Sequence, residues 1–417
     1  MRVFQTLLAF SGNAPPQLAL TRELVDRGHE VRVVAHRAAR ERIESTGAEF
    51  VEFKQALPDL DITRRETDSV RDWEAHTQLG AAKRMRDGLI APLADATREF
   101  VGVLEDWSAD VIVFDWLFNG APIAAEHAGI PAVALVHCPY PLPARGAPPL
   151  FSGQKPMAGP LGAGRDRLLN AMTSRFTAAG LPTLNDVRAE HGLTPLKAWN
   201  DQILGVQAIY VMTAPELDFS SKAQLPANVH YVGPAFEPFE KEWESPWPSE
   251  NTDPLVLISF STSYMDQGAL AQRVLDAVAG LRIRALLTAG PALDPSQLSI
   301  PDNARSVAFV SHRTVLPHAA LVITHAGWQT VNAALADGVP LVCIPDGRDQ
   351  PDNAARVVLA HAGVRASKNS SPEKLRRVIS RALEDQSIKQ GARTMAGALA
   401  RSDGATVIAD ELERLPT

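Results

Sequence analysis

The stretch from residue 321 to 357, LVITHAGWQTVNAALADGVPLVCIPDGRDQPDNAARV, holds the densest set of side chains suited to chemistry. Its apolar start predicts a strand that ends at Thr324, followed by a tight turn and a helix that begins near Trp328. The free backbone N–H groups and the positive dipole end of such a helix bind anions. We therefore expect a diphosphate group at this turn.

Side chains around the turn add groups that suit an anion and a sugar. His325 can donate a hydrogen bond to the anion, and Thr330 offers a hydroxyl from the first turn of the helix. Asp349 and Gln350 follow the next apolar run and are suited to hold sugar hydroxyls. Each of these residues alone is more often structural or solvated, but their positions after successive strands favour a binding site.

The rest of the chain alternates short apolar runs with helical patterns, which is typical of parallel sheets covered by helices. The expected strands lie at 3–10, 30–34, 110–114, 132–136 and 208–212, and then at 255–260, 285–289, 306–310, 321–324 and 341–344. The sequence therefore predicts an α/β protein with two doubly wound, Rossmann-like parallel-sheet domains. Because such sheets bind ligands at the carboxyl ends of their strands, two facing sheets predict a central cleft.

One stretch of the chain breaks this alternation. Residues 215–254 are rich in Pro, Glu, Ser and Asn and predict a linker. We expect one domain over residues 1–235 and a second over residues 236–403, followed by a final helix. Residues 144–164, rich in Gly and Pro, interrupt the first domain and predict a lid, a binding loop or a surface insert.

Composition excludes several classes of protein. The 417 residues include 41 basic and 48 acidic ones, and the net charge of -7 argues against a general surface for nucleic acid. The sequence holds no apolar run that is long enough to cross a bilayer. Cys138 and Cys343 are too few and too far apart for a disulfide framework, which favours a cytoplasmic protein. The apolar start of the chain reads as a first strand rather than a signal peptide.

Five segments, spread along nearly the whole chain, match the pattern of one enzyme family. They are QLALTRELVDRGHEVRVV at 17–34, DVIVFDWLFNGAPIAAEHAGIPAV at 110–133, VLISFST at 256–262, FVSHRTVLPHAALVITHAGWQT at 309–330 and GVPLVCIPDGRDQPDNAARV at 338–357. In these segments the chain resembles the family one nucleotide-sugar-dependent glycosyltransferases of the GT-B fold, especially bacterial members that decorate antibiotics and other natural products. The resemblance implies inverting transfer of a sugar from a UDP- or dTDP-sugar to a small natural-product acceptor.

The resemblance also implies roles for individual residues. His325 would contact the diphosphate, Phe309 and Val310 would lie against the base, and Asp349 with Gln350 would bind the sugar. The whole implied donor site consists of Ser261, Thr262, Phe309, Val310, His325, Gly327, Trp328, Gln329, Thr330, Asp349 and Gln350. The domain over 1–235 would hold the acceptor, and the last helix, about 404–417, would cross back onto it.

The resemblance implies no metal and no cofactor besides the nucleotide sugar. Asp59 and Asp61 form an Asp-x-Asp pattern that binds a metal in other glycosyltransferases. Here the pattern lies in a polar stretch far from the donor motif and predicts a solvated loop. We expect a nucleotide sugar and a small acceptor as the only ligands, no nucleic-acid or membrane partner, and a monomer or homodimer.

The expected catalytic centre departs from the family at one position. Family members carry a histidine near the end of the first strand, which takes the proton of the acceptor, and an aspartate after a later strand that orients it. SGNAPPQLAL places Asn13 at the histidine position, whereas Asp115 matches the aspartate. An asparagine amide has no useful basicity near neutral pH, so Asn13 cannot be the base.

Three replacements for the missing base are open. Asp115 could act directly if a partly buried cleft raises its pKa. His137 follows the strand at 132–136 and lies at the same sheet edge, although such a histidine is more often simply packed or solvated. The acceptor could also be acidic enough to need little help, as a phenol with a pKa near ~10 is. From Asn13 alone we favour a phenolic or similarly acidic hydroxyl.

Further departures from the family lie in the expected donor site. Ala326 and Gln329 replace glycines of the family's turn, and Ser261 stands where glycine is common, so side chains there would crowd the phosphate or bond to it.

Two functions other than O-glycosyl transfer are open. One is an N- or C-glycosyltransferase of the same fold, and the other is a catalytically silent helper that binds nucleotide or a partner enzyme. A sugar-nucleotide epimerase is less favoured, since we find no acid-base carboxylates in the donor half.

Overall fold

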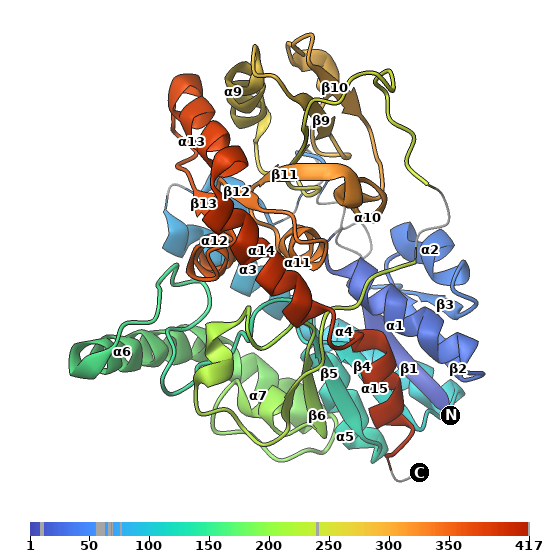
Figure 1. The fold of residues 1–417 in the computed structure, drawn as a ribbon. Coiled ribbons are helices and arrows are strands. Elements are labelled where there is room, and N and C mark those ends of the chain that lie inside the picture. Colours follow the sequence, from blue (N-terminus) through green and yellow to red (C-terminus); the bar gives the residue numbers. More distant parts are fainter. Residues whose placement is uncertain are drawn as a thin grey trace.

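The computed structural model describes residues 1–8, 12–55, 63–65, 68, 70–75, 77–238 and 242–415. Within them the chain forms two separate sheets, one in each half (Figure 1). Neighbouring strands are parallel throughout both sheets. The prediction of an α/β protein with two Rossmann-like parallel-sheet domains is confirmed.

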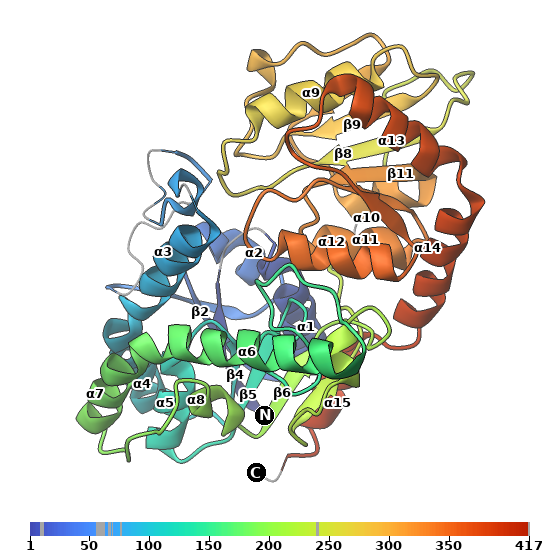
Figure 2. The same cartoon turned by 90° about the vertical axis from the view of Figure 1, so that its left-hand side faces the viewer.

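The first sheet has seven strands in the order β3-β2-β1-β4-β5-β6-β7. Their bounds are β1 Arg2–Leu7, β2 Glu30–Ala35, β3 Glu49–Glu52, β4 Val111–Asp115, β5 Ala132–Val136, β6 Ala208–Val211 and β7 Val229–Tyr231. The helices of this half are α1 Ala14–Asp26, α2 Arg40–Glu44, α3 Gln78–Ile90, α4 Leu93–Asp106, α5 Gly120–Ala128, α6 Gly159–Thr177, α7 Leu181–Glu190 and α8 Asp201–Leu204. Figure 2 shows α6 lying across this half, in front of its sheet.

The second sheet has six strands in the order β10-β9-β8-β11-β12-β13. Their bounds are β8 Leu255–Ser259, β9 Arg284–Thr288, β10 Ala304–Val307, β11 Ala319–Thr324, β12 Leu341–Cys343 and β13 Gly363–Arg365. The helices are α9 Gly268–Val278, α10 His312–Val315, α11 Trp328–Ala336, α12 Gln350–Leu359, α13 Pro372–Glu384, α14 Gln386–Leu399 and α15 Gly404–Leu412. No helix among the residues described here combines the length and the apolar character that crossing a membrane requires.

Alternation along the strands buries both faces of each sheet. Val3 and Leu7 of β1 belong to a core cluster that includes residues of α1 and α15, whereas Phe4, between them, points to the opposite face. There its ring packs edge-on against Phe100 of α4, with the ring centroids 5.8 Å apart. Both faces are therefore apolar, which explains the nearly continuous hydrophobic strands in the sequence.

Strand register places the predicted site residues at the carboxyl ends of the strands in each sheet. In the second sheet Thr324 pairs with Ser259 on one side and with Cys343 on the other. In the first sheet Asp115, the last residue of β4, pairs with Leu135 of β5, two residues before His137. Residues that directly follow these strands therefore meet, although they lie far apart in the sequence.

Two predictions about loops are wrong. The predicted linker over 215–254 contains β7 and a short 3-10 helix, Phe219–Lys222, because the three-residue strand is too short to show in the sequence pattern. The predicted loop over 144–164 ends early, because α6 begins at Gly159 and Pro160 fits its first turn.

Three short strands, β3, β7 and β13, are absent from the predicted set. The strand β10 ends at Val307, before Phe309 and Val310.

The helix α15 returns to the first half and packs against α1, with Arg27 Nη1 2.7 Å from Asp410 Oδ1. At the crossing point Gly404 has no room for a side chain, because a Cβ atom there would lie 2.5 Å from the carbonyl oxygen of Gly233. We expect Gly404→Ala to lower the free energy of unfolding by about 2 kcal/mol, as overpacked sites do. Denaturant unfolding measures this change.

A matched variant separates overpacking from a general effect of glycine replacement. Gly397, in α14, has open space where its Cβ would lie. Gly397→Ala should therefore raise the free energy of unfolding by roughly 0.5–1 kcal/mol, because alanine favours the helix. If both variants were equally stable, the packing at the crossing point would not be as tight as described.

Candidate functional site

A cavity of about 3090 Å³ lies between the two halves and is lined by residues of both. All residues of the predicted donor site line it, as do Asn13 and His137. Asp115 is not among the lining residues and is fully buried. The structure thus brings the predicted residues of both halves to one space.

His137 and Asp115 form a hydrogen-bonded pair at the end of β4 and β5. His137 Nε2 lies 3.1 Å from Asp115 Oδ2. The other carboxylate oxygen of Asp115 accepts a hydrogen bond from the backbone N–H of Leu117 at 3.0 Å. Because both oxygens are occupied and buried, Asp115 is placed to hold a partner rather than to reach a ligand.

The Asp115 carboxylate fixes the proton of the His137 ring. A carboxylate accepts, so the Nε2 atom facing it carries the hydrogen and the lone pair lies on Nδ1. Among the described residues Nδ1 has no hydrogen-bond partner, and the residue lines the cavity. The pair has the arrangement in which an aspartate orients a histidine for proton abstraction.

Gln17 is a member of this centre that the sequence did not predict. Its Nε2 donates to Asp115 Oδ2 at 2.8 Å and to the backbone carbonyl of Asn13 at 3.1 Å. It lies four residues after Asn13 on α1, so the two share one helix face. The sequence offered one signal for Gln17, because it is a polar residue at a buried position of α1.

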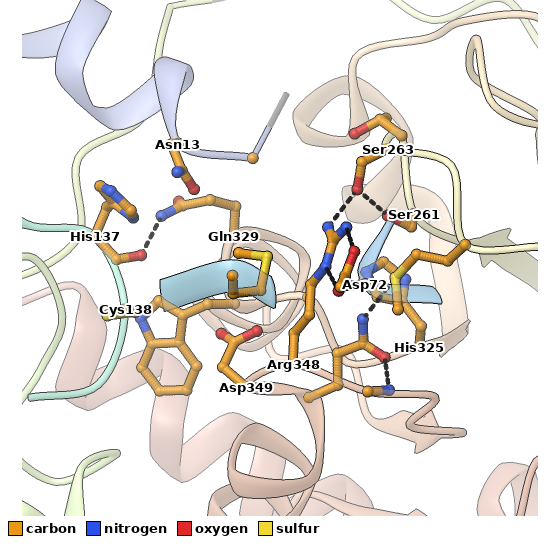
Figure 3. A pocket seen from close by; sticks show the side chains of 18 of the residues that line it. Asn13, Asp72, His137, Cys138, Ser261, Ser263, His325, Gln329, Arg348 and Asp349 are labelled. Atoms are coloured by element: carbon orange, nitrogen blue, oxygen red, sulfur yellow. Dashed lines mark hydrogen bonds and ion pairs between the residues drawn. The ribbon is translucent and has the colours of Figure 1, made fainter. Parts of the chain in front are cut away.

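Asn13 lies at the N-cap of α1 but makes no capping hydrogen bond through its side chain. The amide is therefore free of the helix it precedes, and it lines the cavity. In Figure 3 the side chains of Asn13, His137 and Gln329 lie together on one side of the pocket. Gln329 Nε2 donates to the backbone carbonyl of His137 at 3.2 Å, so the two halves are in contact here.

The turn before α11 has the open helix start that the sequence predicted. Gly327 is the N-cap of α11 and has no side-chain cap, so the backbone N–H groups of the first turn remain available to an anion. A side chain there would displace the His325 ring, because a Cβ atom would lie 2.6 Å from His325 Nε2. Ala326 adopts the left-handed conformation, φ 71°, which makes the turn tight.

His325 is buried beside this turn. Burial lowers the pKa of His325 to about 4, so the ring is neutral near pH 7. Its Nδ1 is buried and has no hydrogen-bond partner. His325 can therefore supply a hydrogen bond to a ligand but no positive charge.

The other predicted donor residues lie around the same space. Ser261 Oγ lies 2.9 Å from Ser263 Oγ, in the loop after β8. The Phe309 side chain is 85% exposed and lines the cavity, so its ring is free to stack on a planar group. Thr262, Val310, Trp328 and Thr330 also line the cavity.

Asp349 and Gln350 end the loop after β12 and begin α12. Burial raises the pKa of Asp349, and its Oδ2 accepts a hydrogen bond from Asn353 Nδ2 at 2.8 Å. The Gln350 Oε1 atom accepts from the backbone N–H of Asp346 at 2.8 Å and so stabilises the loop. Their role in holding a sugar remains a prediction.

An ion pair between two residues that line the cavity was not predicted. The Arg348 guanidinium donates to both carboxylate oxygens of Asp72, each at 2.8 Å. The two residues are 276 positions apart in the sequence, so no local pattern could connect them. Among the described residues no three His, Cys, Asp or Glu side chains gather as a metal site would require. Asp59 and Asp61 lie outside the described residues.

Residues 272–415 match the family model of the C-terminal domain of proteins like erythromycin biosynthesis protein CIII. The 4'-demethylrebeccamycin synthase of Lentzea aerocolonigenes is 29% identical over 99% of each chain. The demethyllactenocin mycarosyltransferase of Streptomyces fradiae is 26% identical over 98% of this chain and 85% of its own. The structure of the glycosyltransferase VinC in complex with dTDP has a TM-score of 0.70 at 21% identity, covering 99% of both chains.

Proposed function

The chain belongs to the family one nucleotide-sugar-dependent glycosyltransferases of the GT-B fold, and from this premise we propose an inverting transfer from a dTDP- or UDP-sugar to a hydroxyl of a small natural product. One observation carries the proposal. The open start of α11 and His137, which is hydrogen-bonded to the buried Asp115, face the same cavity from opposite halves. An anion site and a positioned base in one space suit displacement of a diphosphate by a hydroxyl.

We assign the acceptor to the domain over 1–235, joined by the helix of about 404–417, and the donor to the domain over 236–403. His137 and Asn13 belong to the first range, whereas the turn at His325 belongs to the second. Cys138 and Cys343 are free and buried, which supports the cytoplasm as the compartment.

In the proposed reaction His137 is the general base. The acceptor oxygen attacks the anomeric carbon as its proton passes to Nδ1 of His137, and the bond from that carbon to the diphosphate oxygen breaks. Asp115 holds the ring through Nε2 and stabilises the charge that forms on it. The N–H groups at the start of α11 stabilise the departing diphosphate. Asn13 has no base to offer and positions the acceptor hydroxyl by a hydrogen bond.

We keep a phenolic or similarly acidic hydroxyl as the proposed acceptor. Asn13 motivated this choice, because the sequence offered no certain base. If His137 is the general base, the acceptor hydroxyl does not need to be acidic. We therefore expect aliphatic alcohols to react as well, at lower rates.

The test is transfer from dTDP-glucose and UDP-glucose to phenols of graded pKa and to alcohols of similar shape. We expect a glycoside whose anomeric configuration, read by NMR coupling constants, is opposite to that of the donor. Retention of configuration would contradict the displacement mechanism. Nucleotide binding without transfer to oxygen, nitrogen or carbon, and without donor hydrolysis, would favour the silent helper instead.

A further inference from the structure

Arg348 crosses the cavity from the donor half and pairs with Asp72 of the acceptor half. Nε and Nη2 each lie 2.8 Å from one oxygen of the Asp72 carboxylate, and Nη1 donates to Ser263 Oγ at 2.6 Å. The Asp72 side chain is 3% exposed and that of Arg348 is 20% exposed. This forked geometry is the one that guanidinium groups use for carboxylates and for phosphates alike.

The guanidinium lies among the residues of the predicted diphosphate site. Figure 3 shows it between Asp72 and Ser263, on the side of the pocket where Ser261 and His325 lie. Burial lowers the pKa of His325, and the positive charge of Arg348 adds a smaller contribution in the same direction. Arg348 directly precedes Asp349, a predicted sugar-binding residue.

The site needs a cation that the predicted residues do not supply. A departing nucleoside diphosphate carries negative charge, whereas His325 is neutral near pH 7. The start of α11 contributes only about half a unit of positive charge. Burial acts to lower the pKa of Arg348, but the hydrogen bond and charge of Asp72 raise it overall, so the guanidinium stays charged.

The backbone of Arg348 supports a dedicated placement. Its φ of 53° lies in the left-handed region, which few residues other than glycine adopt. Such conformations persist where the surrounding structure holds them, and they cluster at ligand sites. The loop thus directs the Arg348 side chain into the cavity, although its own backbone is strained at this residue.

We propose that Arg348 binds the diphosphate of the nucleotide sugar, and that Asp72 is a resting counter-ion which the diphosphate displaces. The proposal rests on the proposed function, because it requires a nucleoside diphosphate as ligand. Two phosphate oxygens replace the two carboxylate oxygens on the guanidinium, and Asp72 is released to solvent. Asp72 therefore competes with the donor for the same cation.

Calorimetric titration of dTDP and UDP into the full chain tests this competition. We expect Arg348→Gln to weaken the binding of the diphosphate about 10- to 100-fold, because a charge-assisted hydrogen bond is lost. The affinity of Arg348→Lys should lie between those of the wild type and Arg348→Gln, because an ammonium keeps the charge but lacks the forked geometry of a guanidinium. We expect Asp72→Asn to tighten binding about three- to tenfold, because the cation is then free in every molecule. In the double variant Asp72→Asn should have no further effect.

The chain offers a matched control on the wall of the same cavity. Arg42 Nη2 pairs with Glu237 at 2.6 Å, and both residues line the cavity. Glu237→Gln removes one carboxylate from such a pair, as Asp72→Asn does, and should leave the affinity for dTDP and UDP unchanged.

The outcomes separate this inference from the proposed function. If the wild type binds neither dTDP nor UDP, both ideas fail. If the wild type binds but Asp72→Asn weakens binding or leaves it unchanged, only the counter-ion role fails. If Arg348→Gln binds as tightly as the wild type, Arg348 is not the cation. Asp72→Asn keeps the test decisive if Arg348→Gln does not fold.

Discussion

Replacing His137 by alanine is expected to slow sugar transfer to an alcohol about 10²- to 10⁴-fold, the usual contribution of a positioned general base. The loss should fall mainly on kcat, because in the proposed reaction His137 takes the proton as the new bond forms and contributes little to donor binding. It should shrink as the pKa of a phenolic acceptor falls, since an ionised phenol needs no base. Initial rates over a graded series of acceptors measure both effects.

Two variants make this prediction specific. His127 is an exposed histidine near the end of α5 and is not among the residues that line the cavity, so His127→Ala should transfer at the wild-type rate. Asp115→Ala removes the group that holds the His137 ring and should also slow transfer. If His137→Ala transferred to alcohols at the wild-type rate, the base would have to be another group.

Asp218→Asn is expected to lower the free energy of unfolding by about 3–5 kcal/mol, because it leaves the buried guanidinium of Arg356 without a charged partner. The two side chains are 0% and 1% exposed and join the first half of the chain to α12 of the second half. Asp218 Oδ1 accepts from Arg356 Nη2 at 2.8 Å, and Oδ2 accepts from the backbone N–H of Tyr140 at 2.8 Å. Denaturant unfolding near pH 7 measures the change.

The control is an exposed ion pair between the same halves. Arg401 and Glu216 are 64% and 35% exposed, so Glu216→Gln should change the free energy of unfolding by less than about 1 kcal/mol. A similarly small effect of Asp218→Asn would mean that the buried pair does not hold the halves together.

Acid adds a second readout for the same pair. Burial alone would raise the pKa of Asp218, but Arg356 and the hydrogen bonds lower it overall. A carboxyl group whose pKa is lower in the folded protein stabilises it above the unfolded pKa of about 4 and loses that effect below. The difference between wild type and Asp218→Asn should therefore be constant from about pH 5 to 8 and shrink below about pH 4.

What the sequence predicted depended on how local the signal was. The turn at His325 and Gly327 was found because a strand, a turn and a helix follow one another directly. The short edge strand β3 is half exposed, and β7 lies in a polar stretch, so neither showed the pattern of a buried strand. α6 begins with Gly and Pro, and several of its apolar side chains are exposed, so no core-facing stripe marked it.

The candidate site divides in the same way. His137 could be proposed because it follows a strand, but its bond to Asp115 depends on the register of β4 and β5. Asp72 and Arg348 come from different halves, and only the packing of the halves brings them together. Pairs of this kind need the relative placement of two domains, which alternation of apolar residues does not encode.

The chain leaves its first half after Pro234 and returns to it at Gly404, and these two points are neighbours, because the backbone N–H of Gly404 donates to the carbonyl of Pro234 at 2.8 Å. Two domains whose chain connections meet at one place rotate mainly about that hinge, and displacement grows with distance from it. In Figure 2 α3, which follows the Asp72 segment, lies at the opposite edge of the molecule from the connection between α14 and α15. The pair of Asp72 and Arg348 therefore lies far from the hinge. Breaking this one contact there widens the cleft more than breaking a contact near the hinge.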